Sequence, residues 1–221
     1  MNIIAHRGIH DNINIIENTI EAFEKAIKKN LPIELDVNIT KDKKIVVFHD
    51  NSLRRLAHLN KRINNCTYTE LKKVRLKNSK IPLLEEVLKL VNGKVELYIE
   101  IKNSKNYKET CELVKKILNN YKGKYYIQSF NYKIVKYFID NNIESGLLIT
   151  NNKIDKYYKP MFILKILLKW LNPSFISVSK SMRNKKINRL MKKYKTLIWT
   201  IDYKKESKNY KNKNIICNNL Y

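Results

Sequence analysis

Eight short runs of β-forming residues, each followed by a longer stretch, succeed one another along this chain of 221 residues. The runs start near residues 2, 33, 95, 124, 145, 175, 196 and 214. In most of the intervening stretches apolar residues recur three and four positions apart, as Ile20, Phe23 and Ile27 do, which is typical of helices. Eight β/α repeats in a chain of this length predict a (β/α)8 TIM barrel, an α/β fold with the strands inside and the helices outside.

One part of the chain departs from this repeat. The sequence at 41–44 indicates a turn between residues 33–39 and a further β-type run at 45–49, so we expect a β-hairpin at the second barrel strand. Residues 51–80 follow as the one long excursion between barrel strands, and they are predicted to form a small insertion over the barrel mouth. No linker or shift of composition marks a boundary, so residues 1–221 are predicted to be a single domain.

Carboxylates recur near the predicted ends of two neighbouring strands. Glu34 and Asp36 are two residues apart and therefore share one face of the second strand, and Glu100 shares a face with Lys102 on the third. Barrel active sites gather at the carboxyl ends of the strands, and buried carboxylates there need a compensating charge. Three carboxylates that converge on one mouth would suit a hard divalent cation.

Two of the four histidines are predicted to reach the same mouth. The first strand ends in His6-Arg7-Gly8. If residues 41–44 form the hairpin turn, the paired positions sum to 85, which sets His49 opposite Asp36 to within a residue or two. Each residue alone is a weak signal, and it is their joint spacing that indicates a site.

A longer series of short motifs runs through the chain in a fixed order. It consists of His6-Arg7-Gly8, Glu17-Asn18-Thr19, Glu34-Leu35-Asp36-Val37, Thr40-Lys41-Asp42, Val47-Phe48-His49-Asp50, Leu53-Arg54-Arg55, Ile81–Leu88, Ile99-Glu100-Ile101-Lys102, Gln128-Ser129-Phe130 and Trp199-Thr200. This series resembles the glycerophosphodiester phosphodiesterase family, and it covers nearly the whole chain, most densely between residues 3 and 130. The family fold is a (β/α)8 barrel, which agrees with the strand count.

The resemblance implies a catalytic centre. His6 and His49 match the two catalytic histidines of the family, which act as general acid and base. Its metal ligands, which commonly hold one Mg2+ or Ca2+ ion, match the three carboxylates Glu34, Asp36 and Glu100. All of these positions are intact in this sequence.

The resemblance also implies residues that hold the substrate. Arg7 and Lys102 match cations that bind the phosphate, and Glu17 matches an acidic residue that helps to organise the site. Trp199 matches a position that lines the substrate pocket, although a core aromatic residue is an equal alternative. The family usually has proline where this chain has Ile16, and its last strand, which contributes little to catalysis, often ends differently.

The implied activity is metal-dependent hydrolysis of a glycerophosphodiester to glycerol 3-phosphate and an alcohol. The resemblance leaves open whether water attacks directly or a glycerol hydroxyl first forms a cyclic phosphate. One alternative is lysophospholipase D-type hydrolysis of membrane lipids, so the substrate would be either a small molecule or a lysolipid. A second alternative is a non-catalytic module that binds phospholipid headgroups or nucleic acid, which would not need two histidines.

The net charge of +25 has two explanations that the sequence leaves open. It would attract anionic lipid or a phosphorylated substrate, but lysine, isoleucine and asparagine share A/T-rich codons, and a biased genome would enrich all three. Lysine outnumbers arginine 38 to 7, which disfavours specific nucleic-acid recognition. The three scattered cysteines and the lack of a leader or membrane-span pattern predict a cytoplasmic protein, whose oligomeric state stays open.

The helical stretch predicted from about residue 155 to 171 is unusually apolar. Within 159–171, Lys165 and Lys169 share one helical face and almost every other residue is apolar. This composition, with Trp170 near its end, resembles a helix that dips into a membrane surface. A barrel helix covered by other elements is the alternative. If the membrane interpretation holds, the contacting residues are Phe162, Ile163, Lys165 and Trp170.

Overall fold

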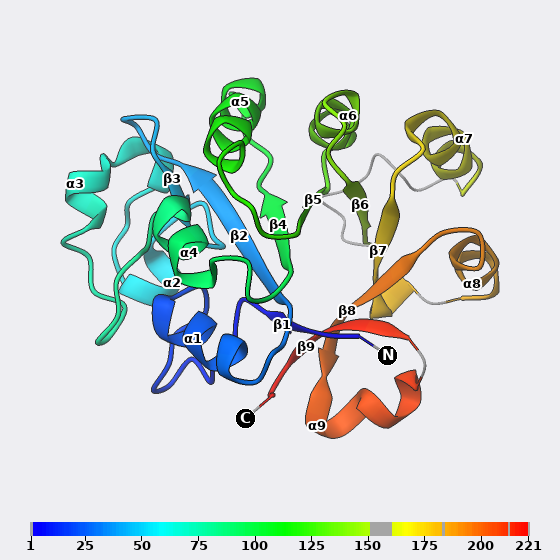
Figure 1. Cartoon of the computed structure of the whole chain (residues 1–221), viewed down its shortest axis with the longest axis horizontal. Helices are drawn as coiled ribbons and strands as arrows, with labels where there is room; N and C mark the ends of the chain where they lie inside the picture. The colour runs from blue at the N-terminus through cyan, green and yellow to red at the C-terminus, as the bar shows by residue number, and fades with distance from the viewer. Residues whose placement is uncertain (1, 151–160, 183, 212, 221) are drawn as a thin grey trace.

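The computed structural model describes residues 2–150, 161–182, 184–211 and 213–220, and it has the predicted barrel (Figure 1). Eight parallel strands form a closed ring because β1 pairs with β2 on one side and with β9 on the other. In chain order the strands are β1 (Ile3–His6), β2 (Ile33–Ile39), β4 (Leu97–Ile101), β5 (Tyr125–Ser129), β6 (Ser145–Ile149), β7 (Phe175–Ser179), β8 (Thr196–Asp202) and β9 (Asn214–Asn218).

Helices surround the ring, as Figure 1 shows. They are α1 (Ile20–Lys28), α4 (Leu84–Val91), α5 (Tyr107–Leu118), α6 (Tyr132–Asp140), α7 (Met161–Leu171) and α8 (Lys185–Met191). The part of the predicted 155–171 helix that precedes Met161 lies outside the described residues. Between β8 and β9 the described residues form two short helices, α9 (Tyr203–Glu206) and the 3-10 helix η4 (Ser207–Tyr210).

The predicted hairpin is present, but its register differs by one residue from the prediction. The backbone N–H of Thr40 donates to the carbonyl of Lys44 (2.9 Å), so the turn holds three residues and not four. Its third residue has a φ of 59°, the left-handed conformation with which three-residue hairpin turns close. Strand β3 (Ile45–Val47) therefore pairs with β2 at positions that sum to 84, and the N–H of Phe48 donates to the carbonyl of Asp36 (2.9 Å). His49 therefore lies one position beyond Phe48, the residue that bonds to Asp36.

The segment after the hairpin builds a small core of its own against β3. It contains α2 (Arg54–Ala57), the 3-10 turn η1 (Ile63–Asn65) and α3 (Tyr68–Leu71). Leu53, Ile63 and Leu71 are buried together with Phe48. In Figure 1 these elements lie on the β3 side of the barrel. Helix α3 is a single turn that ends at Leu71.

The barrel interior is divided into an apolar layer and a polar layer. Tyr98 and Tyr126 stack with their ring centroids 4.7 Å apart, and the ring of Phe175 meets both edge-on. These rings form an apolar plug with Ile4, Leu197 and Ile216. Because side chains alternate along a strand, the next inward position toward the carboxyl end lies above the plug on every strand. On four strands that position carries a polar residue of the site described next, namely His6, Glu100, Gln128 or Asn218, whereas on β6 it carries Leu148.

Candidate active site

A pocket of about 220 Å³ opens above the aromatic plug, at the carboxyl ends of the strands. Both predicted catalytic histidines line it, as do the predicted phosphate-binding cations, two of the predicted metal ligands and the predicted pocket tryptophan: His6, His49, Arg7, Lys102, Glu34, Glu100 and Trp199. The structure therefore brings together residues that lie as far apart as positions 6 and 199. Their position matches the active-site face of a (β/α)8 barrel.

The three predicted metal ligands form one buried cluster. Strand register places Asp36 beside Glu100, and Glu34 lies two residues before Asp36 on the same face of β2. One carboxylate oxygen of each lies within 4.8 Å of the others, and all three side chains are buried. Oxygens that share one Ca2+ ion at roughly 2.3–2.6 Å lie at most about 5 Å apart, so this donor set fits a hard divalent cation.

The electrostatics of the cluster also fit a cation. Burial, together with the charges of Asp36 and Glu100, raises the pKa of Glu34 well above its ordinary value. Burial raises the pKa of Glu100 to about 7 against the pull of Lys102. Burial acts the same way on Asp36, but Lys102 and Arg7 outweigh it and hold that pKa far below its ordinary range. The ammonium of Lys102 lies 2.6 Å from Asp36 Oδ1, and the protein's own cations do not neutralise the whole cluster.

A tight turn at the end of β1 aims Arg7 into the site. Arg7 and Gly8 both have positive φ, 57° and 81°, and a Cβ on Gly8 would lie 2.8 Å from the backbone of Ala22. The turn therefore requires glycine at position 8. From this position the Arg7 guanidinium reaches Asp36 Oδ2 at 3.1 Å and Glu17 Oε1 at 2.8 Å.

His6 is held by a residue of the last strand. Its Nδ1 lies 2.7 Å from the side-chain oxygen of Asn218. An amide oxygen only accepts, so Nδ1 carries the hydrogen and Nε2 keeps its lone pair. Nε2 lies 3.9 Å from Glu34 Oε2. Burial and the charge of Arg7 lower the pKa of His6 to about 3, which keeps the imidazole neutral.

His49 is held by a carboxylate. Its Nδ1 lies 2.5 Å from Asp50 Oδ1, and Asp50 in turn accepts a hydrogen bond from Nε of Arg55 (2.6 Å). Burial and the charge of Lys102 lower the pKa of His49, while Asp36 and the Asp50 hydrogen bond act in the opposite direction. Because the partner of His49 is anionic and that of His6 is neutral, the two imidazoles are electrostatically distinct.

Glu17 joins the insertion to the barrel. It accepts hydrogen bonds from Arg55 Nη2 (2.6 Å), Arg7 Nη1 (2.8 Å) and Asn12 Nδ2 (2.9 Å). Burial alone would raise the pKa of Glu17, but these partners, Arg55 first, lower it to about 2. No role was expected for Arg55 from the sequence, although its motif belongs to the series that resembles the family.

Further residues that contact the site were missed. Asn18 donates to Asp36 Oδ2 (2.8 Å), and Gln128 donates to Glu34 Oε1 (3.2 Å). Both lie in motifs that the sequence analysis quoted without assigning a role. Asn218 lies in the strand from which little was expected, and no local pattern marks it. Its partner, His6, is 212 positions away in the sequence.

Trp199 forms an aromatic wall of the pocket. Its ring meets that of Phe130 edge-on, with the centroids 5.7 Å apart, and its Nε1 donates to the backbone carbonyl of Ser177 (3.1 Å). Both rings line the pocket. From the sequence, Trp199 is equally a core aromatic or a pocket-lining residue, and its position at the pocket favours the second.

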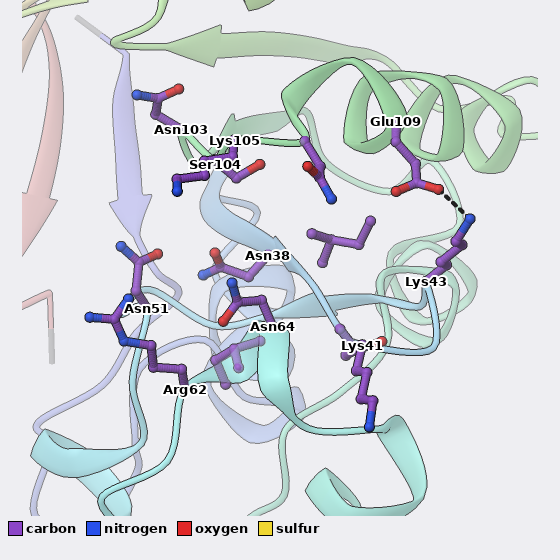
Figure 2. Close-up of a pocket in the computed structure, with 14 residues that line it drawn as sticks. Asn38, Lys41, Lys43, Asn51, Arg62, Asn64, Asn103, Ser104, Lys105 and Glu109 are labelled. Carbon is purple, nitrogen blue, oxygen red and sulfur yellow. Dashed lines mark ion pairs between the residues drawn. The ribbon is translucent and has the colours of Figure 1, made fainter.

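A second hollow of about 490 Å³ flanks the site on the side of the hairpin turn and the start of α5 (Figure 2). Amides and cations predominate among its lining residues, which include Asn38, Asn51, Asn64, Asn103, Lys41, Lys105 and Arg62. Its one acidic residue, Glu109, is paired with Lys43 at 2.6 Å. The hollow offers polar and cationic groups, but neither histidine of the site lines it.

Comparisons with known proteins identify a family. The profile of the Glycerophosphoryl diester phosphodiesterase family matches residues 6–216. A glycerophosphodiester phosphodiesterase of Bacillus altitudinis is 42% identical over 113 residues, which cover 46% of this chain and 45% of the relative. Lysophospholipase D GDPD1 of Homo sapiens is 30% identical over 168 residues, 68% of this chain and 52% of the relative. The chain thus spans about half the length of these curated relatives.

A solved structure gives the same fold over the whole chain. It is an Oleispira antarctica phosphodiesterase in complex with the product sn-glycerol-3-phosphate. The two chains superpose with a TM-score of 0.83, covering 99% of this chain and 92% of the other, at 21% identity.

Proposed function

Because this chain belongs to the glycerophosphoryl diester phosphodiesterase family, we propose that it hydrolyses glycerophosphodiesters to glycerol 3-phosphate and an alcohol. The observation that carries the proposal is the position of two differently partnered histidines, His6 and His49, around one cluster of three buried carboxylates. The relative with bound sn-glycerol-3-phosphate supports the identity of the product.

The two histidines would divide the proton transfers. His6, neutral and with a free Nε2, accepts the proton of the attacking hydroxyl group as that oxygen bonds to phosphorus. His49 gives a proton to the alcohol oxygen as its bond to phosphorus breaks, and the carboxylate of Asp50 supports the imidazolium form against burial and Lys102, which lower the pKa of His49. The attacking hydroxyl belongs either to water, which gives glycerol 3-phosphate directly, or to the substrate's own glycerol, which gives a cyclic phosphate that water then opens to glycerol 3-phosphate.

The phosphate charge would be met by cations. Arg7 and Lys102 line the pocket and hold their charge, because neighbouring carboxylates raise the pKa of each against the effect of burial. Glu34, Asp36 and Glu100 would hold one Mg2+ or Ca2+ ion. When bound, the ion supplies further positive charge to the phosphoryl oxygens. A pure binding module would need no such acid–base pair.

A second candidate is lysophospholipase D-type hydrolysis, in which the substrate carries an acyl chain. The observation that favours it is the match to human lysophospholipase D GDPD1 over 68% of this chain. The aromatic wall of Phe130 and Trp199 gives the pocket an apolar side.

The same proposal covers the setting of the enzyme. We treat residues 1–221 as one domain with 51–80 as its insertion, and we place it in the cytoplasm. Its cysteines Cys66, Cys111 and Cys217 are buried and unpaired, which suits a reducing compartment.

An assay of alcohol release tests the function. The purified protein is given glycerophosphocholine, glycerophosphoglycerol or lysophosphatidylcholine with Mg2+, Ca2+ or Mn2+. We expect turnover of at least one, and a loss of about 10²–10⁴-fold in His6→Ala and His49→Ala. No turnover under any combination would refute the proposal, and preference for lysophosphatidylcholine would select the second candidate.

A further inference from the structure

The exposed apolar side chains of the described residues are concentrated on one helix. Six large apolar side chains are exposed, and four of them belong to α7. They are Phe162, Ile163, Ile166 and Trp170, which are 64%, 40%, 65% and 57% exposed and which we call the apolar ridge. The opposite face of α7 is buried against the barrel through Leu164, Leu168 and Leu171. The helix is apolar on both sides, whereas the outer face of an ordinary surface helix is polar.

A groove beside the ridge carries positive charge. It lies between α7 and α8, has a volume of about 320 Å³, and is lined by five cations, Lys165, Lys169, Lys186, Arg189 and Lys193, with Leu190 and Tyr194. We call it the basic groove. Residues 156–201 contain twelve lysines or arginines and no aspartate or glutamate. A codon bias acts on the whole chain and enriches lysine everywhere, so it does not explain why acidic residues are missing from this segment.

Charge and length restrict what can cover this face. A second copy docked through the same face would bring two basic grooves together, and like charges there would repel. No helix among the described residues is long and apolar enough to cross a bilayer, and α7 has eleven residues. An anionic lipid surface satisfies both features, because its interface takes up apolar side chains and its phosphates attract lysine and arginine.

We propose that α7 docks this protein on the surface of an anionic membrane. The apolar ridge enters the boundary between headgroups and acyl chains, and the basic groove faces the lipid phosphates. Trp170 is held against α6, with its ring 6.3 Å from that of Tyr132 and 5.6 Å from the ammonium of Lys136. Phe162 and Ile163 lie at the start of the helix, which in a β/α repeat is the end nearest the barrel mouth. Docking is independent of the proposed reaction and is measured without turnover.

Flotation with lipid vesicles tests the proposal. The protein is mixed with vesicles of phosphatidylcholine containing phosphatidylglycerol, or of phosphatidylcholine alone. We expect it to float with the anionic vesicles, and to be released as ionic strength rises to about 0.5 M. A triple variant of the ridge, Phe162→Ser with Ile166→Ser and Trp170→Ser, is expected to bind about tenfold or more weakly. The matched control changes the exposed Ile13 and Leu59 to serine, away from α7, and is expected to bind as the wild type does.

Tryptophan fluorescence gives a second measurement, on a variant that keeps the apolar ridge and the basic groove unchanged. The chain has two tryptophans, so Trp199→Phe leaves Trp170 as the only reporter. Its emission should shift to shorter wavelength on anionic vesicles only. The proposal would be overturned if the protein neither floated with anionic vesicles nor shifted its emission. It would also be overturned by equal binding to neutral vesicles, or by an equal loss of binding in the ridge and control variants. A dimer that ultracentrifugation detects and the ridge variant abolishes would assign the face to a second copy instead.

Discussion

The substitution Glu17→Gln tests whether the site is held together by charge. Glu17 is only 3% exposed in its side chain, and it bridges Arg7 of the barrel to Arg55 of the insertion. Glutamine keeps the size of the side chain and removes its charge. The two guanidinium groups then lose the carboxylate that they share, while Arg55 keeps Asp50 and Arg7 keeps Asp36.

The size of the effect follows from the pKa of Glu17, which is lowered from 4.5 to about 2. That difference corresponds to about 3 kcal/mol, at roughly 1.4 kcal/mol for each tenfold change in the acid constant. Solvent reaches the Arg55 side chain, which is 43% exposed, so we expect about 2 kcal/mol of this to be measurable. Because the folded pKa is depressed, the stabilisation is complete above pH 4.5 and is lost as the pH falls from 4.5 through 2.

Urea unfolding at pH 7 and pH 3 measures the free energy of unfolding that the charge of Glu17 contributes. Relative to the wild type, Glu17→Gln should lower the free energy of unfolding by about 2 kcal/mol at pH 7 and by about half of that or less at pH 3. The exposed Glu24 on α1 supplies the control, since Glu24→Gln should change stability by less than about 0.5 kcal/mol. An equal loss at both pH values would refute the reasoning, because it would trace the effect to packing and not to charge.

Two further predictions concern the reaction centre. Chelation of divalent cations with EDTA should abolish hydrolysis and lower the melting temperature, because the carboxylates of Glu34, Asp36 and Glu100 then repel one another. Addition of Mg2+ or Ca2+ should restore both the activity and the melting temperature. Full activity in EDTA would contradict this prediction. Asn218→Ala should lower kcat roughly 10- to 100-fold with little change in KM, because His6 loses the partner that fixes its ring and tautomer. An unchanged kcat and an unchanged pH profile would show that the contact between Asn218 and His6 is dispensable.

The fold could be predicted because its signal is periodic. Strand β2 spans Ile33–Ile39, as the sequence indicated. Its apolar and polar residues alternate because they lie on two different faces of the strand, both of them buried. The hairpin register differs by one residue from the predicted pairing, within its margin of a residue or two, because the sequence at 41–44 does not distinguish a turn of three residues, here closed by Lys43 with a φ of 59°, from a turn of four.

The site could be predicted as far as spacing within a strand reaches. Glu34 and Asp36 share a face by alternation alone, and so do Glu100 and Lys102. The partners that orient these groups come from closure of the barrel, which joins β9 to β1 and sets Asn218 beside His6. Arg55 reaches Glu17 only because the insertion folds back beside the mouth. Such contacts depend on tertiary geometry, and no local pattern of residues carries them.

The net charge of +25 is distributed unevenly, and its two explanations apply to different parts of the molecule. Inside the barrel mouth, cations meet carboxylates closely: Arg7 contacts Asp36 and Glu17, and Lys102 contacts Asp36 and Glu100. These pairs leave no large surplus of positive charge for a distant anion to detect. The surplus lies on the outer surface, and a general enrichment in lysine is the explanation we favour for most of it. Only in residues 156–201 does positive charge coincide with a lack of acidic residues and with an exposed apolar helix, so a specific partner for the charge is to be sought there and not at the active site.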